Sequence, residues 1–399
     1  METTERPDNT LKIPADINYQ CTGCGKCCSG WSVPMTEEDY QRINAVNWAD
    51  LNPDLKNKNL FRTLKANEKI GTPYAYAINP EPNGQCPFLK DNLCFMHSKF
   101  GAQFKPSICQ LFPYCFNETP DGVYTTVSFI SRGAIFNSGQ SLIEQKEYLQ
   151  SKYKEFQKLY PDHHPNWSQI KLSSNWPLTW EQYMDIEKTI LSIMQNKNKS
   201  LEERFIEGSA YLKSRLSNAD LSSLKNGSVL ALNKWDKILL VALYRKYFPP
   251  QNKSAKSYGQ LHLNLSSFMT AIPYINNIEQ LVRETDNIAW SIDADINDLL
   301  YRFFYSRLFA KLYFGAGFGQ LSIITGFNHL AVLLAIIKLK VKALAMTHKD
   351  RKISQSDIIQ TIVQLEKSLG ELRISPYGAA ILELLLSSQQ RVGRFLCQM

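Results

Sequence analysis

The chain has 399 residues, of which 44% are hydrophobic and 21% are charged, and its formal net charge is +8. This composition excludes a largely disordered chain and predicts a folded protein of two domains or more. The positive charge is mild and comes without the Lys/Arg runs that are typical of nucleic-acid binding, so we expect no nucleic-acid partner. Met1–Pro14 is polar and lacks the features of a secretory signal, which predicts a cytoplasmic protein.

Cysteines dominate the first third of the chain. Eight of the nine lie between Cys21 and Cys115, and four of them fall within Cys21–Cys28. Structural disulfides are rare in a reducing cytoplasm, whereas thiolates packed this densely suit a zinc ion or an iron–sulfur cluster. The sequence therefore predicts a metal-binding region, and Cys397 stands apart from it.

The first third of the chain predicts a small, loop-rich α+β domain over residues 1–135. A short helix is expected at Thr36–Ile43, with Thr36 and Asp39 in the positions of a capping box. Short strands are expected at Tyr74–Ile78 and Val123–Ile130, which are rich in β-branched and aromatic residues. Such a domain buries little apolar surface for its length, so we expect its metal to contribute to its stability.

Residues 136–399 predict an all-α domain, so the fold class is mainly α. Capping boxes begin two of its helices, and Pro249-Pro250 ends a third. The expected helices are Leu142–Tyr160, Trp180–Gln195, Leu201–Leu216, Val229–Phe248, Ile296–Tyr313, Leu321–Ala345, Asp357–Leu369 (with Gly370 as the C′ residue) and Ala379–Ser388. The apolar stretch Leu321–Ile337 contains Asn328 and His329, which favours a buried core helix over a membrane span.

Glycines form the string Gly315-Ala316-Gly317-Phe318-Gly319, which resembles the glycine-rich turn that binds S-adenosylmethionine in Rossmann-type methyltransferases. Such a turn needs a preceding strand and an acidic residue about twenty positions later. Here the preceding segment predicts a helix, and the next acidic residue is Asp350. We therefore expect a connection between two helices and assign no catalytic or cofactor-binding residue.

The spacing of the cysteines leaves the metal open. Cys21, Cys24 and Cys27 repeat at the three-residue spacing of bacterial ferredoxins, and Cys86, followed by Pro87, suits a fourth ligand, which favours a 4Fe-4S cluster. Zinc is the alternative, because eight cysteines suffice for two tetrahedral sites, and His97 is a further nitrogen donor. The candidate metal ligands are Cys21, Cys24, Cys27, Cys28, Cys86, Cys94, Cys109 and Cys115. Which four of them share one centre stays open.

Five separated motifs carry a family resemblance across residues 19–135. They are Cys21-x2-Cys24-x2-Cys27-Cys28, Gly30-Trp31, Cys86-Pro87-Phe88-Leu89, Leu93-Cys94 and Lys105-Pro106-x2-Cys109-x2-Phe112-Pro113. In this order they resemble the CxxCxxCC zinc- or iron-chelating domain family. Within it, the longer architecture resembles the flagellin lysine-N-methylases, through the segments Trp180–Leu212 and Leu299–Tyr313. Gln110 and Tyr114 depart from the arginines that members often carry, and Cys115 is an addition to the pattern.

The resemblance implies an iron–sulfur cluster and, for the methylase branch, transfer of a methyl group from S-adenosylmethionine to lysine side chains of a flagellin-like or other protein. The leading hypothesis is therefore a protein lysine N-methyltransferase. The alternatives are a zinc- or iron-binding module without catalysis and an iron–sulfur redox protein. The P-loop, nucleophile-elbow and HExxH motifs do not occur in the sequence.

Overall fold

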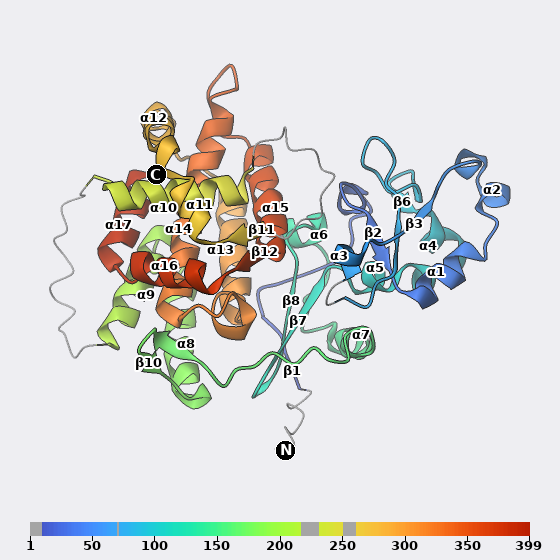
Figure 1. Cartoon of the computed structure of the whole chain (residues 1–399), viewed down its shortest axis with the longest axis horizontal. Helices are drawn as coiled ribbons and strands as arrows, with labels where there is room; N and C mark the ends of the chain where they lie inside the picture. Colours follow the sequence, from blue (N-terminus) through green and yellow to red (C-terminus); the bar gives the residue numbers. More distant parts are fainter. Residues whose placement is uncertain (1–9, 70–71, 217–230, 250–260) are drawn as a thin grey trace. The chain divides into compact units, whose positions relative to one another are not determined.

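The computed structural model describes residues 10–69, 72–216, 231–249 and 261–399 (Figure 1). By their internal contacts, the residues group into two compact units. The cysteine unit comprises Leu11–Phe116 and Thr125–His164, and the helical unit consists mainly of Pro165–Met399 with Asn117–Tyr124. The boundary at residue 135 that the sequence suggests stays a prediction.

The cysteine unit combines short strands with short helices, as the sequence predicts. Its β2, β4 and β3 form one antiparallel sheet in that order, and β5 pairs with β6 in a hairpin. Its strands are β1 (Leu11–Lys12), β2 (Val33–Met35), β3 (Phe61–Thr63), β4 (Tyr76–Ile78), β5 (Leu89–Lys90) and β6 (Leu93–Cys94). The strands β7 (Tyr114–Thr119) and β8 (Gly122–Val127) contain residues of both units, because Asn117–Tyr124 belongs to the helical unit. The helices are α1 (Glu37–Asn44), α2 (Trp48–Leu51), α3 (Ala66–Lys69), α4 (Phe95–Phe100), α5 (Ser107–Leu111), α6 (Arg132–Ile135) and α7 (Lys146–Leu159), with short 3₁₀ turns at Lys26–Cys28, Pro53–Leu55 and Ala102–Phe104.

A small aromatic core holds these short elements together. The indole of Trp48 meets the ring of Phe88 edge to face at a centroid distance of 4.8 Å, and Met35 and Ile43 are fully buried beside them. Three cysteines, Cys86, Cys94 and Cys109, pack against the same core. The core therefore supports part of the cysteine cluster directly.

The helical unit is built around one long apolar helix, α14 (Ile323–Ala345), which packs against α9, α15, α16 and α17. Its remaining helices are α8 (Trp180–Gln195), α9 (Leu201–Ser214), α10 (Lys234–Tyr247), α11 (Leu265–Met269), α12 (Ile275–Thr285), α13 (Ala294–Phe309), α15 (Gln355–Glu371), α16 (Pro376–Leu386) and α17 (Gln389–Gln398), with 3₁₀ turns at Ile272–Tyr274 and Gly315–Gly317. Two strand pairs accompany them: β9 (Lys171–Ser173) with β10 (Trp176–Pro177), and the parallel pair β11 (Leu261–Leu263) and β12 (Leu372–Ile374).

The helix α14 is long and apolar enough to cross a membrane, but 94% of its apolar window is buried inside the structure. The prediction of a core helix is thus confirmed. Its Asn328 donates to the carbonyl of Leu386, and its His329 shares a hydrogen bond of 2.8 Å with the hydroxyl of Tyr247. These bonds allow polar side chains to lie within a helix that is buried almost all round.

Capping boxes predicted from the sequence begin α1, α8 and α9 where expected. Gly315–Gly317 is a turn between α13 and α14, as predicted. The helix expected at Val229–Phe248 begins only at Lys234, behind the cap Asn233, and residues 229–230 lie outside the described residues.

The prediction of Gly370 as the C′ residue of α15 was wrong, because that helix continues through Gly370 to Glu371. The chain then passes directly into β12, which pairs with β11, so the pairing of the strand rather than the glycine determines where the helix ends.

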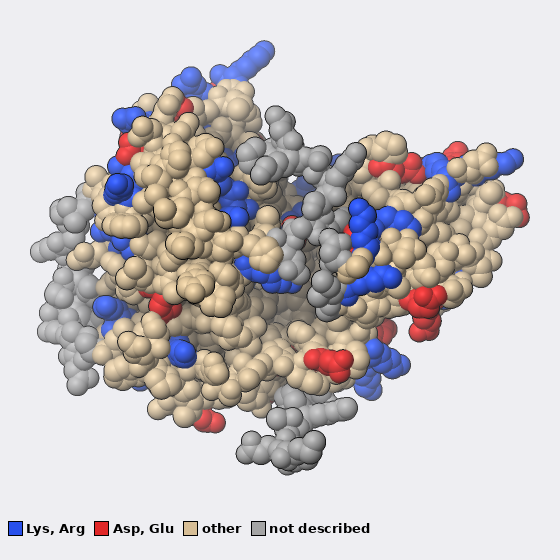
Figure 2. Space-filling view, viewed as in Figure 1, with Lys and Arg blue, Asp and Glu red and all other residues tan. Residues whose placement is uncertain are grey.

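Charged side chains are spread over the surface of both units. On the face shown in Figure 2, lysines and arginines form several small groups that are separated by uncharged residues. One buried carboxylate of the helical unit, Asp236, has two arginine partners from α17: Arg391 Nε lies 2.5 Å and Arg394 Nε lies 2.7 Å from its oxygens. Asp236 thereby ties α17 to the first turn of α10.

Candidate metal centre

The first cysteine segment, Cys21–Cys28, is shaped by two glycines in the left-handed backbone region. Gly23 has φ +61° and Gly25 has φ +66°, values that side-chain-bearing residues adopt at a cost. A Cβ atom on Gly23 would also lie 3.1 Å from a methyl carbon of Leu93. The segment ends in a 3₁₀ turn, Lys26–Cys28, in which the amide of Cys28 donates to the carbonyl of Gly25. The small residues between the cysteines are thus needed for the path of the loop.

Backbone hydrogen bonds join this segment to Cys86, which lies 58 residues further along the chain. The amide of Cys86 donates to the carbonyl of Cys28 at 3.0 Å, and the amide of Gly30 donates to that of Gly84 at 2.7 Å. The bridge between Ser29 and Gln85 lies between these two bonds. Cys28 and Cys86 are therefore neighbours through the backbone alone.

A tight hairpin positions Cys94. Strands β5 and β6 pair Leu89 with Cys94, and the turn between them, Asp91-Asn92, has two residues with positive φ. Asp and Asn favour this turn, which matches the twist of paired strands. Cys94 is then the N-cap residue of α4, so its backbone is held on both sides.

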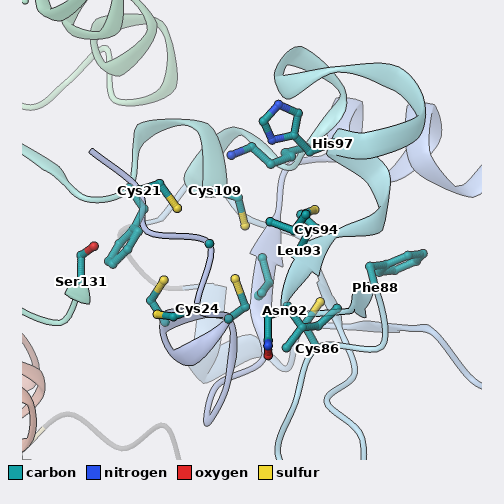
Figure 3. Close-up of a pocket in the computed structure, with 18 of the residues that line it drawn as sticks. Cys21, Cys24, Cys86, Phe88, Asn92, Leu93, Cys94, His97, Cys109 and Ser131 are labelled. Atoms are coloured by element: carbon teal, nitrogen blue, oxygen red, sulfur yellow. The ribbon is translucent and has the colours of Figure 1, made fainter. Parts of the chain in front are cut away.

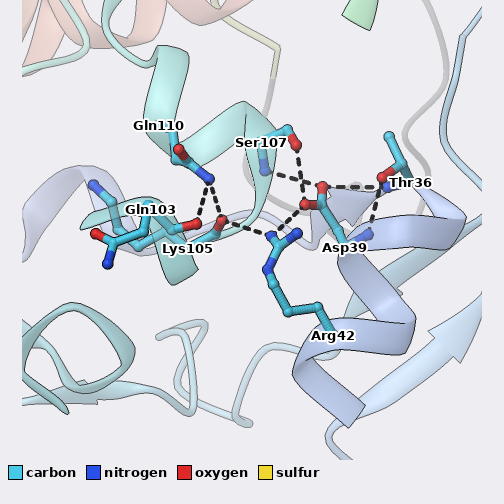
Figure 4. A network of polar contacts seen from close by, with 7 residues as sticks. All are labelled: Thr36, Asp39, Arg42, Gln103, Lys105, Ser107 and Gln110. Atoms are coloured by element: carbon cyan, nitrogen blue, oxygen red, sulfur yellow. Dashed lines mark hydrogen bonds and ion pairs between the residues drawn. The ribbon is translucent and has the colours of Figure 1, made fainter. Parts of the chain in front are cut away.

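The fourth segment carries Cys109 on α5, and the buried carboxylate of Asp39 holds the start of that helix (Figure 4). Asp39 accepts hydrogen bonds from the amide and the hydroxyl of Ser107, both at 2.9 Å, and from Arg42 at 2.6 Å. Arg42 and the Gln110 side chain also donate to the carbonyl of Lys105. The capping box of α1 thus reaches across the unit and determines where Cys109 lies.

Seven of the eight predicted ligands line one cavity of about 180 Å³ within the cysteine unit. In Figure 3, Cys21 and Cys24 lie on one side, Cys86 and Cys94 lie on the other, and Cys109 lies between them. The lining cysteines are Cys21, Cys24, Cys27, Cys28, Cys86, Cys94 and Cys109. His97 lines the cavity as well.

The eighth predicted ligand, Cys115, lies on β7 and is not among the residues that line the cavity. Its thiol donates to the carbonyl of Pro113 at 3.6 Å. A role for Cys115 as a ligand therefore stays a prediction from the sequence.

The thiols that lie deepest are held in their protonated form. A hydrogen bond with Cys27 is the main cause of the raised pKa of Cys28, with burial and the nearby Cys109 and Cys86 adding to it. Burial above all raises the pKa of Cys86 to about 12, and Cys94 adds to the effect. Burial also raises the pKa of Cys109, while Lys105 opposes the rise. Ligation must therefore release protons, and a bound cation would supply the charge that favours the thiolates.

In the part of the chain that the structure describes, no three His, Cys, Asp or Glu side chains already stand together as a metal site would hold them. The donor atoms nevertheless fit a soft metal, because seven cysteine thiols line the cavity. Turning a thiol inward changes one side-chain torsion, which costs little against the roughly 10 kcal/mol that a structural zinc ion contributes.

Thiols that converge on one cavity from four separate segments are typical of cysteine-based metal-binding domains. In agreement, residues 20–132 match the CxxCxxCC family, described as "Putative zinc- or iron-chelating domain". The resemblance of this segment is thus confirmed, and the family supports binding of zinc or iron. The likeness of the longer chain to flagellin lysine-N-methylases stays a prediction.

One curated relative is the uncharacterized protein MJ0939 of Methanocaldococcus jannaschii, which is 26% identical over 197 residues. The match covers 47% of this chain and 62% of that protein, so the chain spans about three fifths of the length of its relative. No solved structure matches the chain.

The sequence did not indicate three features of the site. Asp39 was recognised as part of a capping box, but its reach to Ser107 depends on a contact between residues 68 positions apart. Two cations in the lining were not recognised as such: Lys105 was noted only as part of the motif around Cys109, and Arg132 carried no motif. The Asp91-Asn92 pair was a usable signal for the hairpin that places Cys94, because such pairs favour two-residue turns.

Proposed function

We propose that the cysteine unit is a metal-binding module whose thiolates hold zinc or iron. The observation that carries this proposal is the convergence of seven cysteines from four segments on one cavity. Bound metal would cross-link four segments that share only a small core, and so stabilise the unit.

Purification without oxygen, followed by metal and sulfide analysis, tests the proposal. We expect zinc or iron in stoichiometric amount. Visible absorption that bleaches on reduction would identify an iron–sulfur cluster. The spacing Cys21-x2-Cys24-x2-Cys27 favours this outcome. A colourless protein with zinc would identify the alternative. A protein that takes up neither metal under reducing conditions would refute the module.

A second candidate is a cytoplasmic protein lysine N-methyltransferase that contains an iron–sulfur cluster and uses S-adenosylmethionine. Its support is the resemblance of Trp180–Leu212 and Leu299–Tyr313 to flagellin lysine-N-methylases. Its partner would be a flagellin-like or other lysine-bearing protein, without nucleic acid and without membrane insertion. A third candidate, an iron–sulfur redox protein, would need a cluster that is reduced and reoxidised without loss.

Calorimetry with S-adenosylmethionine separates these candidates. The methyltransferase should bind it in the metal-loaded form and bind it less after Cys24→Ser, because the cluster supports the cofactor site in this hypothesis. Absence of binding by the fully loaded protein would eliminate the methyltransferase and leave the metal-binding module.

A further inference from the structure

Adjacent cysteines at the end of the first segment have different neighbours. Cys27 lies beside Tyr19, as does Cys21, and both affect the pKa of that tyrosine. Cys28 lies beside Cys86 and Cys109, and its thiol also shares a hydrogen bond with Cys27. The two residues share a 3₁₀ turn, in which successive side chains project about 120° apart. The string of four cysteines thus has two sets of further neighbours, which meet at the contact between its last two members.

The first set contains Cys28 and three further thiols, all of them partly buried. Cys86, Cys94 and Cys109 pack against the aromatic core, and Cys28 joins Cys86 through the backbone bond of 3.0 Å. The four cysteines come from four separate segments, and Cys86 lies in a loop between β4 and β5. Four thiolates complete the coordination of a tetrahedral ion, which is the arrangement of closed structural sites.

In the second set, Cys21, Cys24 and Cys27 belong to one glycine-containing loop, and Cys21 is exposed. Like Cys28, none of these three is among the described residues that pack against the aromatic core. Three thiolates leave one position of a four-coordinate metal open. Ser131 lies on this side of the cavity, next to Cys21 in Figure 3, and Tyr19 lines it as well.

We propose that the cysteine unit holds two metal centres rather than one. The inner centre is closed by Cys28, Cys86, Cys94 and Cys109. The outer centre is held by Cys21, Cys24 and Cys27 and takes its fourth ligand, a water molecule or a small nitrogen or sulfur donor, from outside the chain. This inference rests on the proposed metal-binding function, and it assigns Cys86 to the inner centre instead of making it the fourth ligand of the ferredoxin-like triplet.

Loading the full-length protein with Co²⁺ or Zn²⁺ without oxygen tests the division. We expect about two ions per chain. The double variant Cys21→Ser, Cys24→Ser should lose about one ion and keep the cobalt spectrum of a four-thiolate site. Cys397→Ser, which changes an exposed cysteine of the helical unit, serves as the matched control and should keep both ions. Added imidazole should change the cobalt spectrum of the control and leave that of the double variant unchanged.

Alkylation of the unaltered protein during chelation avoids variants that fail to fold. Mass spectrometry should find Cys21, Cys24 and Cys27 labelled together as the first ion leaves, and the four inner cysteines labelled with the second. Two results would overturn the division: a single centre that is lost on substitution of any of the seven cysteines, or labelling of Cys86 together with Cys21. A protein that binds no metal would instead refute the proposed function itself.

Discussion

Replacing Asp39 by alanine should loosen the helix that carries Cys109. Asp39 is fully buried and accepts two hydrogen bonds from Ser107, at the start of α5, each 2.9 Å long. A hydrogen bond to a charged group contributes about 1.5–3 kcal/mol. The side chain of Arg42, which donates the third bond, is 30% exposed, so we expect its ion pair with Asp39 to add little to the free energy. We therefore expect Asp39→Ala to cost about 3–5 kcal/mol, the range for a broken buried charge contact.

Hydrogen exchange of the full-length protein measures this cost locally. A loss of 3 kcal/mol corresponds to an increase of about 100-fold in the exchange of amides that open with α5. Ser107→Ala removes only the hydroxyl and should cost about 1 kcal/mol. We also expect the Asp39→Ala protein to lose metal to a chelator faster, because Cys109 is then poorly held.

The control is Asp236→Ala, which removes a buried, arginine-paired carboxylate from the helical unit. It should destabilise that unit by a similar amount and leave exchange at Ser107–Leu111 and the retention of metal unchanged. Two results would refute the reasoning: unchanged exchange at Ser107–Leu111 in the Asp39 variant, or equal loss of metal in both variants.

Four further predictions concern single positions. A Cβ on Gly326 would lie 1.9 Å from the carbonyl oxygen of Tyr313, so Gly326→Ala should lower the free energy of unfolding by about 2 kcal/mol or more in urea titration. Gly370 lies within α15, and a Cβ added to it would have no atom within 4 Å beyond its chain neighbours and the helix backbone. Gly370→Ala should therefore raise the free energy of unfolding by about 0.5–1 kcal/mol, and a decrease would contradict the helical position of Gly370. Burial lowers the pKa of His329 to about 3, so stability should be complete above about pH 6.5 and fall by about 2–3 kcal/mol by pH 4.5. His329→Gln should remove that part of the pH dependence, and an unchanged profile would show that His329 is not its source. Cys115→Ser should leave the metal content of the protein unchanged, because Cys115 does not line the cavity. A loss of metal from this variant would show that Cys115 is a ligand.

Local signals predicted much of the fold. Capping boxes depend on residues three positions apart, and the starts of α8 and α9 at Trp180 and Leu201 were correct to the residue. The short, polar-faced helices α12 and α17 were missed, as were the strands β11 and β12. These strands have three residues each, and their pairing joins residues more than a hundred positions apart. No local pattern contains that pairing.

The cysteine set of the site followed from composition, but its grouping did not. Spacing suggested that Cys21, Cys24 and Cys27 belong together, and this agrees with their common loop. The place of Cys28 depends on the direction of one turn and on its backbone bond to Cys86. A shift of a single residue in that pairing would exchange the neighbours of Cys27 and Cys28, and the sequence holds no signal of that precision.

The two groups of thiols also differ in how much backbone must become ordered when a metal binds. Packing and hydrogen bonds hold the segments that carry Cys86, Cys94 and Cys109, so an ion bound there meets ligands whose backbones are already ordered. Ordering a backbone residue costs about 1–2 kcal/mol, and this cost lowers the affinity of any site that must be ordered on binding. The loop Cys21–Cys28 contains two glycines with positive φ, and none of its cysteines is among the described residues that pack against the aromatic core, so the outer ion should bind more weakly and exchange faster. An inner centre of high affinity beside an outer centre of lower affinity suits a division of labour in which one metal maintains the fold and the other is available for chemistry or transfer.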